Sequence, residues 1–276
     1  MSTVLIEGSG VEVRHGSVVA LASSSFSIPS NAVTALIGPN GSGKSSLLNA
    51  IAGLAGTGSV TIGGAAADRM RHRVAYVLQT TKVNESMPVT VREVVTMGRF
   101  STSGVFGRLT GADRAAVDVA IDRLGLADIA ERHLSELSGG ERQRVFVAQG
   151  LAQDHDVLLL DEPYTAVDFV SHQSIERAIA DERGTGCSVV MSTHDLSVAS
   201  TADHVILLAG RVVAEGPPAE ALTTDTLSSA YGTRFMRLAD GRFFIDDPAH
   251  TPVPGRHSHL ERTIHPEAPG GGLHDD

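Results

Sequence analysis

The sequence predicts an α/β fold with a mainly parallel sheet, and three segments carry this prediction. Residues 32–37 form a short apolar run that leads into a glycine-rich loop and then into helix-like residues 46–52. Residues 156–162 contain four consecutive apolar positions without polar alternation, which is typical of a strand covered on both faces. Residues 188–193 form a third apolar strand of this kind.

The loop after the first strand has the residues of a phosphate-binding site. Residues 38–46 fit the pattern G-x-x-x-x-G-K-[ST]. Between a strand and a helix, the glycines let backbone N–H groups turn toward phosphates, and the helix start adds free donors and its positive dipole end. This order argues against a chance glycine-rich turn. The predicted set is Gly38, Pro39, Asn40, Gly41, Ser42, Gly43, Lys44, Ser45 and Ser46, with Lys44 on the β- and γ-phosphates and the Ser45 hydroxyl on Mg²⁺.

Two carboxylates, Asp161 and Glu162, follow the second strand. Phosphoryl transfer needs one carboxylate near Mg²⁺ and another group that orients or deprotonates the attacking water. We therefore assign Asp161 to the metal and Glu162 to the water. A solvated acidic loop after a core strand is the alternative interpretation.

Residues 137–144 read Leu-Ser-Gly-Gly-Glu-Arg-Gln-Arg and predict the start of a helix. Ser138 can cap this helix, and Gly139 and Gly140 allow close backbone approach. A helix start of this kind can bind an anion, although an ordinary capped helix would show the same pattern.

Residues 137–141 match L-S-G-G-[QE] completely, which is the signature motif of the ATP-binding cassette (ABC) ATPases. With its three motifs together, the chain resembles this family over roughly residues 3–235. The resemblance implies a P-loop NTPase core with a mainly parallel sheet, an antiparallel β subdomain at its edge and a helical insert. The strand-rich look of residues 3–37 and 58–63 fits that antiparallel edge. The resemblance also implies that two copies of the chain pair as a homodimer. Each copy then presents its signature to the γ-phosphate bound by the other, through Ser138, Gly139, Gly140 and Glu141.

The resemblance also places single residues. Gln79 fits the Q-loop glutamine that senses Mg²⁺ and the membrane partner, Asp168 the D-loop aspartate at the subunit interface, and His194 the switch histidine at the γ-phosphate. His15 stands where an aromatic residue, commonly Tyr, stacks on adenine, so we predict moderate ATP affinity and weak base selectivity. The implied catalytic set is Glu162, His194 and Lys44, and the implied Mg²⁺ set is Ser45, Gln79 and Asp161.

The net charge, the cysteine count and the lack of a long apolar segment fit a cytoplasmic protein that works with a membrane-bound partner. The formal charge of −10 argues against nucleic-acid binding, and a single cysteine, Cys187, excludes an internal disulfide and is expected to pack as a small hydrophobe. No segment reaches the ~18 apolar residues of a membrane span. We expect a cytoplasmic chain, held at the inner face of the membrane by an integral permease, with ATP and Mg²⁺ as cofactors and a substrate-binding protein in the full system.

The substrate of that system is suggested by ancestry alone. Residues 89–100, 151–154 and 161–168 are similar to the manganese/zinc importer branch, and the related iron-siderophore, haem and cobalamin importers share much of the pattern. A soluble ABC protein that acts on ribosomes or DNA would usually carry two cassettes or long coiled-coil arms. A small-molecule P-loop kinase would not need residues 137–144.

We predict two regions: an ABC ATPase domain over residues 1–245, with a helical subdomain at about 80–155, and a disordered tail rich in His, Pro and Gly over residues 246–276. His257 and His259 could share a metal ion, although a solvated tail without ligands is the simpler expectation. Within the helical part, Thr110 and Asp113 resemble a capping box.

Overall fold

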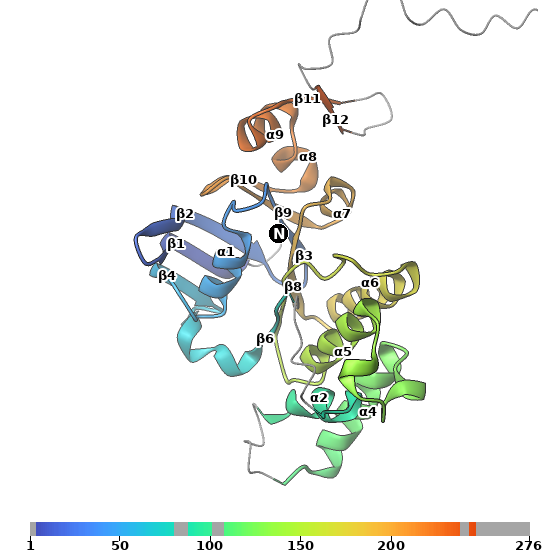
Figure 1. Cartoon of the computed structure of the whole chain (residues 1–276). Helices are drawn as coiled ribbons and strands as arrows, with labels where there is room; N and C mark the ends of the chain where they lie inside the picture. The colour runs from blue at the N-terminus through green and yellow to red at the C-terminus, as the bar shows by residue number, and fades with distance from the viewer. Residues whose placement is uncertain (1–3, 80–87, 101–107, 238–242, 247–276) are drawn as a thin grey trace, which may run out of the picture.

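The computed structural model describes residues 4–79, 88–100, 108–237 and 243–246, and a six-stranded sheet lies at its centre (Figure 1). The strand order is β10-β9-β3-β8-β7-β6. Neighbouring strands from β9 to β6 run parallel, and β10 is antiparallel to β9. The bounds are β3 Val33–Ile37, β6 Val74–Val77, β7 Val157–Leu160, β8 Ser188–Thr193, β9 His204–Leu208 and β10 Val212–Gly216.

A second, antiparallel sheet stands beside the first and has the order β2-β1-β4-β5. It consists of β1 Val4–His15, β2 Val18–Pro29, β4 Thr57–Ile62 and β5 Ala65–Ala66. Helix α1 (Lys44–Ile51) shares one hydrophobic core with this sheet and with one face of the central sheet. A small hairpin of β11 (Arg234–Arg237) and β12 (Phe243–Asp246) lies near the end of the described chain.

The central strands are buried on both faces, as their continuous apolar runs predict. In β7, Val157 and Leu159 enter the core that contains α1, whereas Leu158 and Leu160 enter the core on the other face. All four side chains are 0% exposed. Successive side chains of a strand point to opposite faces, so a strand between two cores must be apolar throughout.

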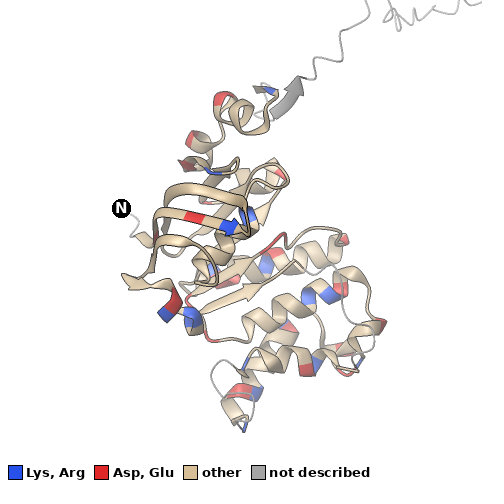
Figure 2. Cartoon of the chain, turned by 60° about the vertical axis from the view of Figure 1, so that its left-hand side comes forward, with Lys and Arg blue, Asp and Glu red and all other residues tan. Residues whose placement is uncertain are grey.

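Helices cover the second face of the central sheet. Helices α2 (Val91–Met97), α4 (Gly111–Arg123), α5 (Gly139–Leu151) and α6 (Phe169–Gly184) gather at the lower end in Figure 1, opposite α8 (Pro218–Ala221) and α9 (Thr224–Tyr231), with α7 (Leu196–Ser200) nearer the upper end. In the described part of the chain, short 3₁₀ turns span Ala67–Arg69, Arg71–Arg73, Ala127–Ile129 and Leu134–Glu136. Charged residues of both signs are interspersed on the lower helices, while the central strands carry few (Figure 2).

Helices α2 and α4 both begin with a capping box. Thr110 caps α4 in a capping box with Asp113, as predicted, whereas the capping box of Thr90 and Glu93 on α2 was not foreseen. Among the described residues, no helix combines the length and the apolar character needed to span a bilayer. The domain limits remain predictions, and the proposed His-rich tail lies outside the described residues apart from its first position.

Candidate functional site

The glycine-rich loop turns directly into α1, which begins at Lys44. Gly43 caps this helix with a φ of 100°, and a Cβ at this position would lie 2.7 Å from the carbonyl oxygen of Ala20. Only glycine fits both constraints. The Lys44 side chain is buried and its Nζ donates to the carbonyl oxygens of Gly38 at 2.9 Å and Pro39 at 3.3 Å.

The electrostatic environment of Lys44 is mixed. Burial lowers the pKa of Lys44, and the carboxylates of Glu162 and Asp161 oppose this change by attraction. The ammonium therefore sits between loop carbonyls and two acidic groups.

One hydroxyl links the two carboxylates that follow β7. Ser192 on β8 donates to Asp161 Oδ1 at 2.6 Å and accepts from the backbone N–H of Glu162 at 2.8 Å. Both Ser192 and Asp161 are buried, with exposed fractions of 0% and 5%. The bond occupies one oxygen of Asp161 and fixes the carboxylate at the carboxyl edge of the sheet.

Glu162 is at the centre of the arrangement. Its Oε2 accepts from the Thr165 hydroxyl at 2.8 Å and from Gln79 Nε2 at 3.2 Å, and it lies 3.8 Å from His194 Nδ1. The backbone of Glu162 has a φ of 49°, which is unusual for a residue other than glycine. Strained backbone of this kind clusters at functional sites.

Two adjacent cavities meet at Glu162. A cavity of about 310 Å³ is lined by Glu162, Gln79, Ala20 and residues 40–46. A second cavity of about 440 Å³ is lined by Gly38, Pro39, Asn40, Glu162, Thr165, His194 and Tyr231. The structure thus brings the loop, Gln79, Glu162 and His194 to one place, while Asp161 lies just beneath it.

His15 stands slightly apart from this group. It ends β1, its side chain is exposed, and its Nε2 lies 3.5 Å from the Ser46 hydroxyl. It does not belong to the residues that line the two cavities, so its ring borders the loop from outside.

Residues 138–141 of the signature segment lie away from the two cavities at Glu162. Ser138 caps α5, its hydroxyl accepts from the Glu141 N–H at 3.2 Å, and Glu141 accepts from the Ser138 N–H at 2.8 Å. These bonds hold the pKa of Glu141 below its usual range. The predicted helix start is confirmed, yet Ser138, Gly139 and Gly140 line neither of the two cavities formed by their own chain.

Gly140 packs instead against the start of α6 in the same chain. A Cβ on Gly140 would lie 2.4 Å from Asp168 Oδ2 and 2.7 Å from the Ser171 hydroxyl. Asp168 caps α6 by accepting from the Ser171 N–H at 2.9 Å and from its hydroxyl at 3.0 Å, and these bonds lower the pKa of Asp168. The second glycine of the signature therefore has a role in packing that the motif alone does not reveal.

Three residues at this site were not predicted from the sequence. Ser192 is a polar residue inside an apolar strand two positions before His194, and this interruption was a usable signal. Thr165 follows Glu162 by three residues, the spacing of a turn. Tyr231 comes from α9, so no local pattern links it to the loop.

Comparison with known proteins decides the family. The family model described as "ABC transporter" matches residues 21–165. The chain belongs to the ABC transporter family. Hence it is an ATP-binding ABC ATPase.

Relatives of this ABC ATPase are found in several bacteria. A probable metal transport system ATP-binding protein of Chlamydia pneumoniae is 37% identical over 64% of this chain and 71% of its own length. The zinc transport system ATP-binding protein TroB of Treponema pallidum is 41% identical, covering 63% and 66%. The manganese transport system ATP-binding protein MntB of Bacillus subtilis is 35% identical, covering 66% and 73%.

Solved structures agree with the fold. A dimeric bacterial ABC transporter cassette matches 78% of this chain and 99% of its own, with a TM-score of 0.68 and 26% identity. A metal-chelate type ABC transporter captured facing inward matches 89% and 98%, with a TM-score of 0.74 and 22% identity. The ABC ATPase fold predicted from the sequence is therefore confirmed.

Proposed function

We propose that this ABC ATPase hydrolyses ATP at a site shared between two copies of the chain and thereby powers the import of a transition-metal ion of the manganese/zinc type. The observation that carries the proposal is the convergence on Glu162 Oε2 of Gln79, Thr165 and His194 beside the phosphate loop. The signature segment lies outside this group, which leaves room for a second chain to complete it.

The loop is the proposed phosphate site. Residues 38–46 would surround the phosphates with backbone N–H groups, and Lys44 would exchange its carbonyl partners for phosphate oxygens. The Ser42 hydroxyl is buried without a hydrogen-bond partner among the described residues, and a bound phosphate would supply one. His15 would stack on the adenine, where its small ring predicts weak base selectivity.

The residues present fit Mg²⁺. Ser45, Gln79 and Asp161 offer a hydroxyl, an amide carbonyl and a carboxylate, which are the hard oxygen donors that Mg²⁺ prefers. When bound, Mg²⁺ would supply positive charge that neutralises the charge developing on the transferred phosphoryl group. Ser192 would support this role, because it donates to Oδ1 of Asp161 and so holds the carboxylate in place at the end of β7.

Glu162 is the proposed group that orients or deprotonates the attacking water. The Thr165 hydroxyl and the Gln79 amide donate to one of its oxygens and fix the carboxylate's direction. His194 would contact the γ-phosphate, and its side chain is 62% exposed and therefore open to a ligand. Lys44 would stabilise the charge that develops on the transferred phosphoryl group.

The second copy would complete the site with Ser138, Gly139, Gly140 and Glu141, whose helix start supplies free N–H groups and a positive dipole end. Asp168 would lie at the interface of the two copies. Closure on ATP and reopening after hydrolysis would pass to an integral permease through Gln79, as a difference in affinity between the open and closed states.

The proposals for the substrate and the remaining partners are based on related proteins. The three bacterial relatives are named for metal, zinc and manganese transport. We therefore assign this chain to a metal-ion importer that contains a permease and a substrate-binding protein and that holds the ATPase at the inner face of the membrane. Iron-siderophore, haem or cobalamin import is the second candidate, because those branches share much of the pattern in residues 89–100, 151–154 and 161–168.

Substitution of Glu162 by Gln tests the catalytic proposal. General-base action contributes about 10²–10⁴-fold to rate, so Glu162→Gln should lower ATP turnover by that range while the chain still binds ATP and remains a closed dimer. The measurements are steady-state hydrolysis with Mg²⁺ and the molecular mass in solution with and without ATP. Glu220→Gln, which changes an exposed carboxylate on α8, is the matched control.

Two results would contradict parts of the proposal. Near-normal ATP turnover of Glu162→Gln would show that another residue orients or deprotonates the attacking water. A variant that binds ATP but remains monomeric at saturation, also with its copurified permease present, would refute the shared site. Uptake of Mn²⁺, Zn²⁺ and ferric siderophore in cells with and without the chain then separates the substrate classes.

A further inference from the structure

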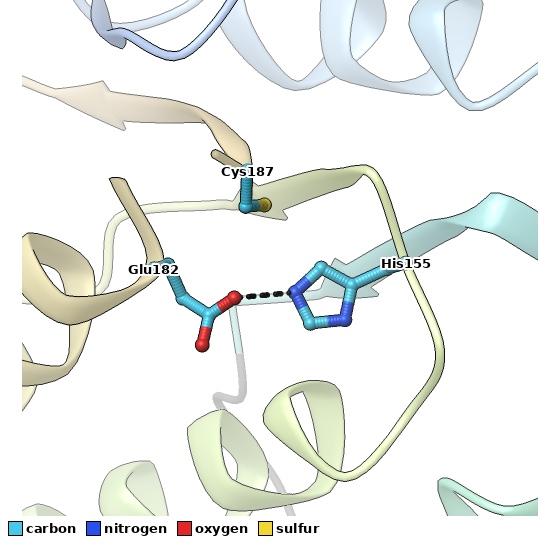
Figure 3. Close-up of side chains that lie close together, drawn as sticks. All are labelled: His155, Glu182 and Cys187. Carbon is cyan, nitrogen blue, oxygen red and sulfur yellow. Dashed lines mark hydrogen bonds and ion pairs between the residues drawn. The ribbon is translucent and has the colours of Figure 1, made fainter. Parts of the chain in front are cut away.

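Three side chains with metal-binding atoms meet at the amino ends of β7 and β8, at the opposite end of these strands from Glu162 and His194. His155 precedes β7, Cys187 precedes β8, and Glu182 comes from the last turn of α6 (Figure 3). Their ligand atoms all lie within 4.8 Å of one another. The side chains of His155 and Glu182 are 5% and 8% exposed, and Cys187 is 6% exposed.

The imidazole is oriented as in a metal site. His155 Nδ1 lies 2.6 Å from the carbonyl oxygen of Gln153, and Nε2 lies 3.0 Å from Glu182 Oε2. The ring nitrogen that faces Glu182 is also the one on the Cys187 side in Figure 3. A histidine that binds a metal typically donates its other N–H to a carbonyl or carboxylate, and here Gln153 accepts that bond.

This arrangement differs from a nucleophilic triad. In such a triad the acid and the nucleophile contact opposite nitrogens of the imidazole, so that the ring can pass a proton between them. Here the carboxylate contacts Nε2, which is also the ring nitrogen on the Cys187 side, so carboxylate and thiol lie on the same side of the ring. Three different ligand atoms within 4.8 Å of one another on one side of the ring favour coordination of a shared ion.

The other oxygen of the Glu182 carboxylate, Oε1, also has a hydrogen-bond partner. Arg123 on α4 donates to Glu182 Oε1 at 2.6 Å and to the carbonyl oxygen of Ala178 at 3.1 Å. This leaves Oε2 directed at His155. Tetrahedral Zn²⁺ with bonds of ~2.0–2.2 Å to nitrogen and oxygen places those two atoms about 3.4 Å apart, within a few tenths of an ångström of the 3.0 Å observed here.

The donor set offers negative charge to an incoming cation. The Glu182 carboxylate and a Cys187 thiolate would supply two negative charges beside a divalent ion, which limits the cost of burying it.

We propose that His155, Glu182 and Cys187 form a binding site for a thiophilic divalent cation of the Zn²⁺ class, with one remaining coordination position for water. The nitrogen, sulfur and carboxylate donors select Zn²⁺ or Co²⁺ over Mg²⁺ and Mn²⁺, which favour oxygen. The ion would join the starts of β7 and β8 to the end of α6, and through Arg123 to α4. This site is independent of ATP turnover and of the transported substrate.

Cobalt is a direct probe of the site. The chain contains one cysteine, so a sulfur-to-cobalt charge-transfer band in the near ultraviolet reports Cys187 alone, whatever the other histidines bind. We expect the chelator-treated, full-length protein to develop this band with one equivalent of Co²⁺ and to lose it on addition of Zn²⁺ but not of Mg²⁺ or Mn²⁺. The Cys187→Ala variant should show no band.

Stability and a matched histidine variant provide further readouts. Zn²⁺ should raise the Tm of the wild type and of His172→Gln, which changes a half-exposed histidine elsewhere on α6, but not that of Cys187→Ala or His155→Gln. The proposal is overturned if the wild type shows no sulfur-to-cobalt band at several equivalents. It is also overturned if Zn²⁺ shifts the Tm of Cys187→Ala as much as that of the wild type. Both outcomes can be read even if His155→Gln does not fold.

Discussion

At the scale of single residues, the Ser192 hydroxyl connects two groups with different proposed tasks. It donates to the buried Asp161 carboxylate and accepts from the Glu162 N–H, at the point where the Glu162 backbone adopts its unusual φ of 49°. A hydroxyl can donate and accept at once, and alanine can do neither. The position of both carboxylates therefore depends on a residue that contacts neither ATP nor water in the proposed mechanism.

Substitution of Ser192 by Ala should lower kcat by about 10- to 100-fold, because displacement of a catalytic group by 1 Å can cost about 10²-fold. Loss of the buried hydrogen bonds should also reduce the free energy of unfolding by about 1–3 kcal/mol. The matched control is Ser188→Ala on the same strand, whose buried hydroxyl accepts from the Asn31 N–H at 2.8 Å. Urea unfolding and ATP hydrolysis are measured on both variants. A kcat equal to that of Ser188→Ala would contradict the positioning role.

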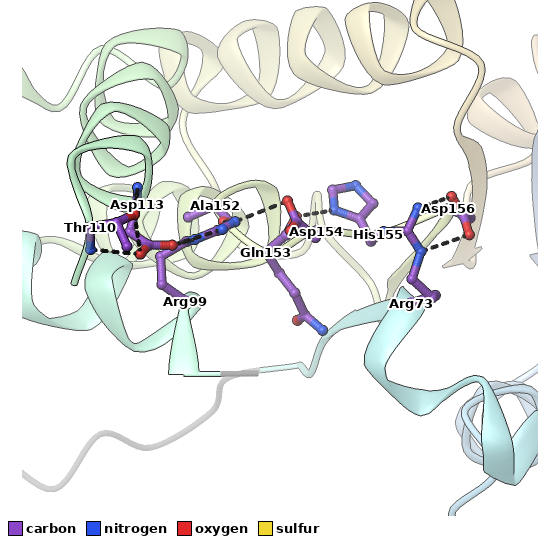
Figure 4. Close-up of polar contacts among 9 residues, drawn as sticks. All are labelled: Arg73, Arg99, Thr110, Asp113, Ala152, Gln153, Asp154, His155 and Asp156. Carbon is purple, nitrogen blue, oxygen red and sulfur yellow. Dashed lines mark hydrogen bonds and ion pairs between the residues drawn. The ribbon is translucent and has the colours of Figure 1, made fainter. Parts of the chain in front are cut away.

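At the scale of elements, a buried ion-pair cluster fixes the helical part to the start of β7. Arg99, 8% exposed, pairs with Asp113 on α4 at 2.9 Å and with Asp154 at 3.1 Å, and donates to the carbonyl oxygen of Ala152 at 2.8 Å (Figure 4). Asp156, at the end of the same connection, pairs with Arg73. The segment between α5 and β7 is thus held at several points, which limits the motion of α5 relative to the strand.

The Asp113 carboxylate gives this cluster a predictable pH dependence. Hydrogen bonds from the Thr110 hydroxyl and N–H, together with Arg99, lower the pKa of Asp113 to about 2. A carboxyl whose pKa is lower in the folded state stabilises the protein above its unfolded value of about 3.9, and this contribution disappears as the pH falls toward 2. Asp113→Asn should therefore be less stable than the wild type at neutral pH. Thermal unfolding should show the difference shrinking between about pH 4 and pH 2.

Asp122→Asn, on the exposed face of the same helix, is the control for this titration. It should change the Tm little at any pH. A constant difference between Asp113→Asn and the wild type across the acidic range would show that the carboxylate charge is not what stabilises the start of α4.

The same helix shows how far a sequence can be interpreted. The capping box of Thr110 and Asp113 is predictable, because both partners lie within one turn and the residue types specify the bonds. The pairing of Asp113 with Arg99 across 14 residues is not, since it depends on how α2 and α4 pack. Likewise, the P-loop and Glu162 were found from motifs, whereas Tyr231 and the meeting of His155 with Glu182 required three-dimensional structure.

At the scale of the whole molecule, an exposed apolar pair lies beside the proposed interface. Phe169 and Val170 begin α6 directly after Asp168 and are 74% and 62% exposed. Large apolar side chains at such exposure cost little individually, but together next to a functional loop they favour a contact. In the proposed dimer this pair would face the second copy.

Substitution of Phe169 by Glu should weaken ATP-dependent dimerisation of the Glu162→Gln chain without lowering the Tm of the monomer. A charge placed in an apolar contact opposes its burial, whereas the exposed monomer surface accepts it. Val119→Glu on α4, where Val119 is 55% exposed, is the control and should leave the dimer intact. Sedimentation of the three chains with ATP measures the effect. Equal dimerisation of all three would place the interface elsewhere.

The contact of Gly140 with Asp168 has a consequence for the kinetics of the dimer. In the proposed dimer, Gly140 would serve the nucleotide of the neighbouring copy, while Asp168 follows the segment that carries Glu162, the proposed water-orienting residue for its own nucleotide. The two positions pack too closely to shift separately, since even a methyl group on Gly140 would overlap Asp168. In the proposed dimer, a change at one nucleotide would therefore alter the affinity for the other, and this coupling would be reciprocal. ATP hydrolysis by the pair should be positively cooperative, with a Hill coefficient above one.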